Sequence, residues 1–350
     1  MNSMVTGTAG MIYKTYDDLS DVIHKNLSIL SSEKFDLIVG VPRSGMIPAL
    51  MIAADLQISV CSMTDLLNNN TIQRLGRRII KDEVTQPHEA KKILIVEDSW
   101  GGGGKFIELV KSLPRSIQKK VSTLAIYSAE TTANVDFAFE LVPKPRLFEW
   151  NIYHHEVMLG NSCFDMDGVL CEDPTNDQND DSYEYLKFIE SAAPKWIPVY
   201  TIKTIVTSRL EKYRKPTEQW LKRNNVKYDK LIMLEGYTAE ERARQGIHGA
   251  FKALEYAKDD YSHPYSLFVE SNPHQAIEIN RITNKPVFCT ENNTLINAVV
   301  VESTNFHSPV PTRKAVKDFA KAHTILRIIT KPIYKVYKRT RKLIRRNKTS

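Results

Sequence analysis

The chain has 350 residues, about two domains' worth, and its 42% hydrophobic content with 14 glycines excludes wholesale disorder. The net charge of +7 is unevenly placed: residues 311–350 hold 14 Lys or Arg and one acid, leaving 34 basic and 40 acidic residues in residues 1–310. We therefore expect an acidic body with a basic tail. No apolar run approaches the roughly 18 residues of a membrane-spanning helix. The four cysteines form no CxxC pair, which favours a reducing cytoplasm over a zinc ribbon.

Short apolar segments alternate with helical patterns along the chain, which predicts parallel α/β architecture. The first half contains four expected strands, at residues 35–41, 58–63, 93–97 and 121–128. The second half contains five, at residues 162–165, 201–207, 230–234, 266–270 and 286–289. The stretch 142–155, rich in proline and aromatic residues, is the natural boundary between the two series. We expect two parallel-sheet domains, residues 1–155 and 156–308, followed by a tail over residues 309–350.

Two turns in the first half have the composition of phosphate-binding loops. The strand at residues 93–97 ends in Glu97 and Asp98, and four glycines and Lys105 follow before a helical segment. Residues 42–46, Pro-Arg-Ser-Gly-Met, form a second tight turn after the strand at residues 35–41. Glycines let backbone N–H groups close around a phosphate, and both loops fall at the carboxyl edge of a parallel sheet. Taken alone, the glycine stretch could equally be a flexible turn, with the two acids capping a helix.

Together these segments resemble the substrate-binding motif and the pyrophosphate loop of type I phosphoribosyltransferases, whose donor is 5-phosphoribosyl pyrophosphate (PRPP). The resemblance covers residues 10–150 and implies that Glu97 and Asp98 hold the ribose hydroxyls. It also implies Mg²⁺ at the pyrophosphate and a mobile hood over residues 64–92. The implied PRPP-binding residues are Arg43, Ser44, Gly45, Glu97, Asp98, Ser99, Gly101, Gly102, Gly103, Gly104 and Lys105.

One departure from that family concerns the phosphate loop, where threonines are usual and this chain has Gly101, Gly102 and Lys105. The acceptor of the phosphoribosyl group therefore does not follow from the resemblance. Pyrophosphate departs through an oxocarbenium-like state, so cations are needed on the departing charge. The hood offers three candidates, any of which could instead belong to a solvated basic face: Arg74, Arg77 and Arg78.

The second half contains a pair of aspartates, Asp165 and Asp167, directly after an apolar strand. Such a pair supplies one carboxylate nucleophile and one acid that can reach the leaving oxygen, although it could also be a simple pair of metal ligands. Further along the chain come a strand with Thr207, a helix with Lys252 and a strand with Glu270. Taken singly, these three residues could be a helix cap, a surface lysine and a solvated acid.

This order of motifs resembles the haloacid-dehalogenase-like (HAD) phosphatases over residues 156–300. The resemblance implies Asp165 as the nucleophile, Asp167 as general acid and then base, Thr207 as a phosphoryl ligand and Lys252 as the neutralising cation. It implies a Mg²⁺ site made by Asp165, Asp167 through its carbonyl, Glu270 and Asn272, although Glu-Ser-Asn replaces the usual pair of acids. Only 41 residues separate Asp167 from Ser208, which leaves little room for a large cap and suits bulky substrates.

The tail over residues 313–348 combines basic residues with apolar residues at helical spacing, among them Ile325, Ile329 and Ile333. Such a segment favours an anionic membrane surface, at ~1 kcal/mol per cation. Nucleic acid is the competing partner and is disfavoured, because a purely electrostatic arm does not need the isoleucines. A disordered, solubilising tail is the plainest alternative.

Taken together, the two halves resemble the bifunctional enzymes that install ribofuranose in bacterial capsule and O-antigen polysaccharides. Such an enzyme would transfer phosphoribosyl from PRPP to a glycan acceptor, which is often lipid-linked, and then remove the 5-phosphate to leave a β-ribofuranoside. Its expected location is the inner face of the cytoplasmic membrane. The alternatives are nucleobase salvage coupled to a nucleotidase, and a PRPP-sensing regulator that binds nucleic acid.

Overall fold

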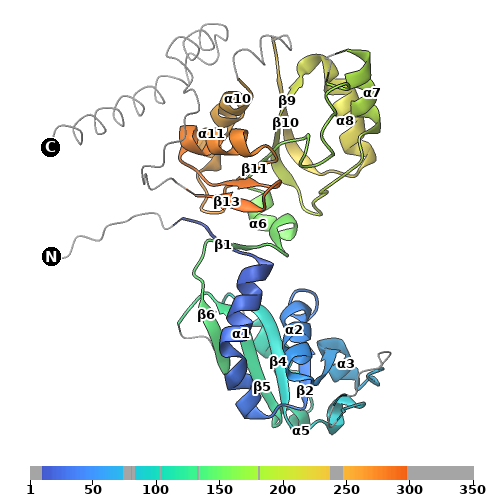
Figure 1. The fold of residues 1–350 in the computed structure, drawn as a ribbon, viewed down its shortest axis with the longest axis vertical. Helices are drawn as coiled ribbons and strands as arrows, with labels where there is room; N and C mark the ends of the chain where they lie inside the picture. Colours follow the sequence, from blue (N-terminus) through green and yellow to red (C-terminus); the bar gives the residue numbers. More distant parts are fainter. Residues whose placement is uncertain are drawn as a thin grey trace, which may run out of the picture.

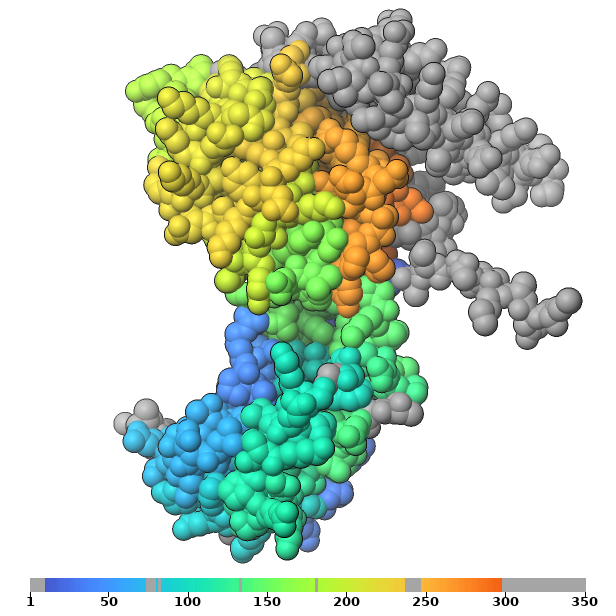
Figure 2. All heavy atoms as spheres, turned by 180° about the vertical axis from the view of Figure 1, so that it is seen from behind, coloured from blue at the N-terminus to red at the C-terminus, as the bar shows by residue number. Residues whose placement is uncertain are grey.

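The computed structural model describes residues 10–73, 80, 83–102, 104–131, 134–179, 182–236 and 247–297. Two sheets flanked by helices lie one above the other in Figure 1, and Figure 2 shows two lobes joined by a narrower waist. The predicted α/β architecture with parallel sheets is confirmed. The predicted tail lies outside the described residues. Within the described part, no helix is long and apolar enough to cross a membrane.

The first sheet has the strand order β3-β2-β4-β5-β6, and all its neighbouring strands are parallel. Its strands are β2 (Leu37–Gly40), β3 (Ser59–Ser62), β4 (Ile93–Trp100), β5 (Val121–Ser128) and β6 (Phe137–Leu141). Its helices are α1 (Tyr16–Glu33), α2 (Met46–Leu56), α3 (Met63–Asn68), α4 (Lys105–Lys111) and α5 (Arg115–Gln118), with a 3₁₀ turn η1 (Pro87–Glu89). Because successive strand residues face opposite sides, Leu94 and Val96 pack with α1 and α2, whereas Ile93 and Ile95 pack with α3, α4 and α5.

The second sheet has the order β10-β9-β8-β11-β12-β13, parallel except for the antiparallel pair β12–β13. Its strands are β8 (Cys163–Phe164), β9 (Ile202–Leu210), β10 (Tyr228–Leu234), β11 (Phe268–Glu270), β12 (Val287–Cys289) and β13 (Thr294–Ile296). Its helices are α7 (Tyr183–Ser191), α8 (Arg214–Arg223), α10 (Ile247–Tyr256) and α11 (Pro273–Thr283), with the 3₁₀ turns η3 (Glu211–Tyr213) and η4 (Asp259–Tyr261). Among the described residues between β8 and β9, α7 is the one helix.

A small parallel sheet lies between the two large ones and joins β1 (Ile12–Lys14) to β7 (Arg146–Phe148). Met11, directly before β1, and Leu147 of β7 belong to the core of the second sheet, and the hydroxyl of Tyr13 donates to Asn293 Oδ1 at 2.6 Å. The 3₁₀ turn η2 (Ile152–His154) and the short helix α6 (Glu156–Leu159) continue into the second sheet. The segment that joins the two lobes is therefore packed rather than loose.

Three strands are longer than their apolar patterns predicted, since β10 begins at Tyr228 and both β4 and β9 end later, and four strands were not predicted at all. β4 continues to Trp100 and β9 to Leu210, so Glu97, Asp98 and Thr207 lie within strands rather than at their ends. Backbone pairing with the next strand carries β4 through its polar residues, as in the pairs Ser99–Tyr127 and Trp100–Ser128. The unpredicted strands are short or carry polar residues, which weakens an apolar signal: β1, β6, β7 and β13.

Candidate functional site

The turn between β2 and α2 contains three of the predicted phosphate-binding residues, Arg43, Ser44 and Gly45. A β-carbon on Gly45 would lie 2.7 Å from the carbonyl oxygen of Val96, so only glycine lets the turn lie this close to β4. The exposed Arg43 guanidinium donates from Nη2 to Asn151 Oδ1 at 2.5 Å. The turn therefore presents a cation directly beside the strand that carries Glu97 and Asp98.

The two acids of β4 have different surroundings. Asp98 is buried, and its Oδ2 accepts from Trp150 Nε1 at 2.6 Å and from Asn151 Nδ2 at 3.4 Å. Asn151 thus bridges Asp98 and Arg43, and it comes from the segment between the two large sheets. Glu97 is half-buried, and burial raises its pKa to about 9, with a further contribution from its hydrogen bond to Asp98 and from the charge of that neighbour.

The protonation of Glu97 leads to a prediction about stability and pH. The folded protein keeps this proton up to about pH 9, whereas an unfolded glutamate loses it near the ordinary value of 4.5, so stability falls as pH rises between the two. Replacing Glu97 with Gln removes this titration. We expect E97Q to gain stability relative to the unliganded wild type as pH rises from 5 to 8, measured by urea denaturation.

An exposed glutamate provides the control for this experiment. Glu190→Gln removes a carboxyl at the surface of α7 and tests whether any lost negative charge gives the same change. A stability difference between Glu97→Gln and wild type that stays constant from pH 5 to pH 8 would contradict the protonated state of Glu97.

The glycine loop after β4 leads into α4, whose first residue is the exposed Lys105. Gly102 has a φ of +85°, and a β-carbon there would lie 2.8 Å from Glu130 Oε1. Gly103 lies outside the described residues. Two cations that the sequence analysis did not assign hold this loop: Lys144 donates to the Gly101 carbonyl at 3.0 Å, and the buried Arg146 donates to the Trp100 carbonyl at 2.8 Å.

The predicted hood begins with α3 and returns through η1. The segment after α3 and the segment before η1 meet where the backbone N–H of Ile72 donates to the carbonyl of Thr85 at 2.8 Å. His88 ties the returning arm to α3 through a 2.8 Å contact between its Nε2 and the Leu66 carbonyl. The three arginines proposed for the departing charge, Arg74, Arg77 and Arg78, lie outside the described residues.

The second cluster of polar residues is centred on Lys252, which is only 2% exposed. From α10, its Nζ donates to Asp165 Oδ2 at 2.5 Å, to Glu270 Oε2 at 2.6 Å and to Gln275 Oε1 at 2.8 Å. Asp165 follows β8, and Glu270 ends the adjacent strand β11. Burial raises the pKa of Asp165 to about 7, although the Lys252 ammonium opposes this. Burial by itself lowers the pKa of Lys252, but the charges of Asp165 and Glu270 and their hydrogen bonds outweigh it, so the pKa is raised.

Asp167 is held by a residue to which the sequence analysis gave no role, the buried Arg209 of β9. The guanidinium donates from Nη2 to Asp167 Oδ1 at 2.5 Å and from Nε to Oδ2 at 3.2 Å. The hydroxyl of Tyr185 also donates to Asp167 Oδ2, at 3.1 Å. Thr207, two residues before Arg209, is buried, and its Oγ1 accepts from the Arg209 backbone at 3.3 Å. The contacts to Arg209 and Tyr185 fix the direction of the Asp167 carboxylate.

The remaining predicted ligands lie around a tight turn at Gly168, which has a φ of +74°. The Asp167 carbonyl accepts from Ser271 Oγ at 3.2 Å. Glu270 Oε1 accepts from the backbones of Ser271 and Asn272, both at 3.0 Å. The Asn272 side-chain oxygen accepts from two backbone N–H groups at the start of α11, so it caps that helix.

The acidic groups around Asp165 offer oxygen atoms, which are the ligands that Mg²⁺ prefers. Among the described residues, no group of three or more His, Cys, Asp or Glu side chains is arranged to hold a metal. The carboxylates nevertheless repel one another: after burial and the opposing Lys252 charge, Glu270 and Asp167 raise the pKa of Asp165. Asp173, which the sequence analysis missed, touches the same turn, and loss of surrounding water and then the Asp167 charge raise its pKa. Asp165 and Glu270 are thus oxygen donors of the type that Mg²⁺ binds, and the Lys252 ammonium contacts both of them.

No protein-family model matches the chain, and no curated protein matches it. Solved structures do. A purine phosphoribosyltransferase from Pyrococcus horikoshii matches with 22% identity over 41% of this chain and 94% of its own, with a TM-score of 0.31. The Helicobacter pylori xanthine-guanine-hypoxanthine phosphoribosyltransferase matches with 18% identity over 41% of this chain and 93% of its own, with a TM-score of 0.31.

An orotate phosphoribosyltransferase from Aeropyrum pernix matches with 16% identity over 36% of this chain and 71% of its own, with a TM-score of 0.25. These likenesses fall in the N-terminal part of the chain. At such identities and TM-scores they do not assign an activity, which has to come from the residues of the two sites.

Proposed function

We propose that this chain transfers a 5-phosphoribosyl group from PRPP to a hydroxyl of a glycan and then hydrolyses the 5-phosphate, leaving β-ribofuranose. The observation that carries the proposal is the buried Lys252, which bridges Asp165 and Glu270 in the same chain as the Arg43–Asn151–Asp98 network. Phosphoribosyl transfer yields a product with a 5-phosphate monoester. A phosphate monoester is also the substrate of the proposed hydrolysis at Asp165.

In the transfer step, the acceptor oxygen bonds to C1 of the ribose as the bond from C1 to pyrophosphate breaks. The hydroxyl proton passes to solvent water, the departing pyrophosphate takes the electron pair of the broken C1–O bond, and the configuration at C1 inverts. Arg43 and Ser44 bind the departing pyrophosphate, and Glu97 and Asp98 hold the ribose hydroxyls. The loop from Ser99 to Lys105 holds the 5-phosphate through backbone N–H groups and the Lys105 ammonium.

In the second step, Asp165 attacks the phosphorus and forms an aspartyl-phosphate while Asp167 gives a proton to the leaving C5 oxygen. Water then hydrolyses the aspartyl-phosphate, and Asp167 takes the proton of that water. Thr207 and Lys252 bind the phosphoryl oxygens. Arg209 and Tyr185 contact the two Asp167 oxygens and hold this carboxylate in one orientation. This arrangement resembles the HAD-like phosphatases.

The proposal includes Mg²⁺ as cofactor. In the second site Asp165, Glu270 and the Asp167 carbonyl would hold it, with Asn272 and Asp173 close by. When bound, Mg²⁺ neutralises charge on the phosphoryl oxygens. The acceptor glycan is proposed to be lipid-linked, with the tail over residues 313–348 on the inner face of the cytoplasmic membrane. That tail lies outside the described residues, so its role stays a prediction.

The test is mass spectrometry of a glycolipid fraction incubated with PRPP and Mg²⁺. Wild type is expected to add a pentosyl group, and Asp165→Asn is expected to add a phosphopentosyl group, because an amide in place of this carboxylate cannot form the aspartyl-phosphate. Chelation of Mg²⁺ by EDTA is expected to stop both the phosphoribosyl transfer and the hydrolysis of the 5-phosphate. If neither protein modifies glycan and PRPP is consumed only with free nucleobases, the glycan proposal fails and nucleobase salvage replaces it.

A further inference from the structure

Apolar side chains gather on the exposed segment between α7 and β9. Trp196 is 45% exposed, Val199 56% and Tyr200 39%, and we call these three residues the aromatic strip. Single exposed apolar residues are common, but two large exposed aromatic side chains within residues 196–200 leave much apolar surface in water, which is unfavourable. The strip is therefore a candidate binding surface.

The indole of Trp196 is held in place rather than free to turn. It stacks on Tyr153, with ring centroids 4.9 Å apart and ring planes 3° from parallel. Its backbone N–H donates to the Val169 carbonyl at 3.3 Å, and that of Lys195 donates to the Leu170 carbonyl at 2.9 Å. Because Tyr153 and the backbone fix the ring, a ligand that stacks on Trp196 loses little entropy to ordering the protein.

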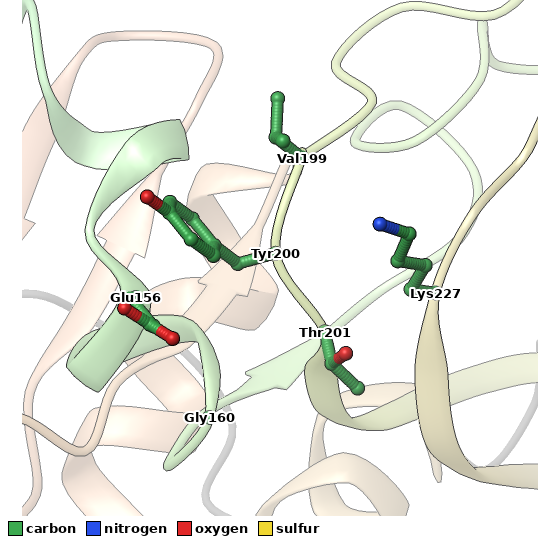
Figure 3. A pocket seen from close by; sticks show the side chains of 6 residues that line it. All are labelled: Glu156, Gly160, Val199, Tyr200, Thr201 and Lys227. Atoms are coloured by element: carbon green, nitrogen blue, oxygen red, sulfur yellow. The ribbon is translucent and has the colours of Figure 1, made fainter.

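The Tyr200 end of the strip opens into a cavity of about 260 Å³. Figure 3 shows the Tyr200 ring reaching toward the helix that carries Glu156, with the Lys227 side chain on the other side of the segment. The cavity is lined by Glu156, Gly160, Val199, Tyr200, Thr201 and Lys227. It thus offers an aromatic face, a carboxylate, an ammonium and two hydroxyls within one small space.

The strip is connected to both candidate sites by short stretches of chain. Tyr153, which supports Trp196, lies two residues after Asn151, the residue that contacts Arg43 and Asp98. Val169, which accepts from the Trp196 backbone, lies two residues after Asp167. These links join the Trp196 end of the strip to both candidate sites, whereas the cavity at Tyr200 lies where β9 and β10 begin, at the edge of the second sheet opposite Asp165.

We propose that the aromatic strip binds sugar rings of the glycan acceptor, an inference that rests on the proposed function. A sugar ring presents C–H groups with partial positive charge on one face, and these suit the negative face of an indole or a phenol ring. Its hydroxyls donate and accept hydrogen bonds, which matches the mixed donors and acceptors of the cavity. The strip holds sugars beyond the one that receives the ribose and keeps the glycan bound through both steps.

The test compares Trp196→Ala and Tyr200→Ala with wild type in the glycolipid assay, at varied glycolipid and varied PRPP. Each variant is expected to need about tenfold more glycolipid for half-maximal transfer, the scale of one lost stacking contact. The PRPP concentration for half-maximal transfer is expected to stay within twofold. Hydrolysis of p-nitrophenyl phosphate reports that the second lobe is folded. Tyr183→Ala, which removes a 65% exposed tyrosine outside the strip, is the matched control.

Three outcomes separate the strip from the function on which it depends. A glycolipid requirement that rises in both variants but not in Tyr183→Ala supports the strip. Variants that match Tyr183→Ala within twofold, while wild type modifies glycan, overturn the strip alone. A wild type that consumes PRPP with nucleobases and never modifies glycan overturns both.

Discussion

Replacing Lys252 with Met is expected to abolish phosphate-ester hydrolysis and to lower the free energy of unfolding by about 3–5 kcal/mol, because breaking a buried ion pair leaves charge uncompensated. Asp165 and Glu270 are 5% and 1% exposed, and the Lys252 ammonium contacts both. Without it, two carboxylates remain side by side in a buried space. Urea denaturation measures the stability, and hydrolysis of p-nitrophenyl phosphate with Mg²⁺ measures the activity.

Two further variants separate the buried pair from general effects of losing a lysine. Lys258→Met breaks the Lys258–Glu255 ion pair, whose lysine is 29% exposed, and is expected to cost less than about 1 kcal/mol with hydrolysis intact. Adding Glu270→Gln to Lys252→Met removes one of the stranded charges and is expected to restore part of the stability but no activity. A Lys252→Met protein with stability and hydrolysis near those of wild type would exclude the proposed role of this lysine.

The candidate site residues could be predicted from the sequence where they directly follow a short apolar strand. The strand that ends beside Asp165 and the strand that holds Glu270 both stand out as short apolar runs followed by acids, and parallel neighbours bring such residues to one edge. Lys252 was expected from the order of motifs as the neutralising cation, and the structure places its ammonium in contact with both carboxylates. Its role in the reaction stays a prediction.

The partners of those residues could not be predicted, because they come from segments with no local signal. Asn151 and Trp150 contact Asp98 from more than 50 residues away, and Arg146 reaches the glycine loop across 46 residues. Arg209 lies two residues beyond the predicted strand at residues 201–207, and its pairing with Asp167 depends on β9 continuing past Thr207. The apolar pattern breaks off at that point, and the pairing of β9 with β10 shifts register between Val206 and Leu210 before the strand ends.

Asp98 gives the prediction with the largest effect in the first lobe. Asp98→Ala leaves the Trp150 N–H without its 2.6 Å partner in a buried place, which is expected to cost about 1–3 kcal/mol. It also releases Asn151, which holds Arg43. We expect phosphoribosyl transfer to fall by at least about a hundredfold, as for a lost transition-state contact. Hydrolysis of p-nitrophenyl phosphate is expected to stay within twofold, because that chemistry lies in the other lobe.

Asp98→Asn separates the charge of this residue from its packing. The amide oxygen can still accept from Trp150, so stability is expected to stay within about 1 kcal/mol of wild type. If the carboxylate charge holds the ribose hydroxyls, transfer falls as far as in Asp98→Ala. If transfer is instead retained, Asp98 acts only by positioning Trp150 and Asn151, and the ribose contact passes to Glu97. Trp150→Phe tests the same question from the other side, since it removes the N–H that donates to Asp98 and keeps an aromatic ring, smaller than the indole, next to Phe148.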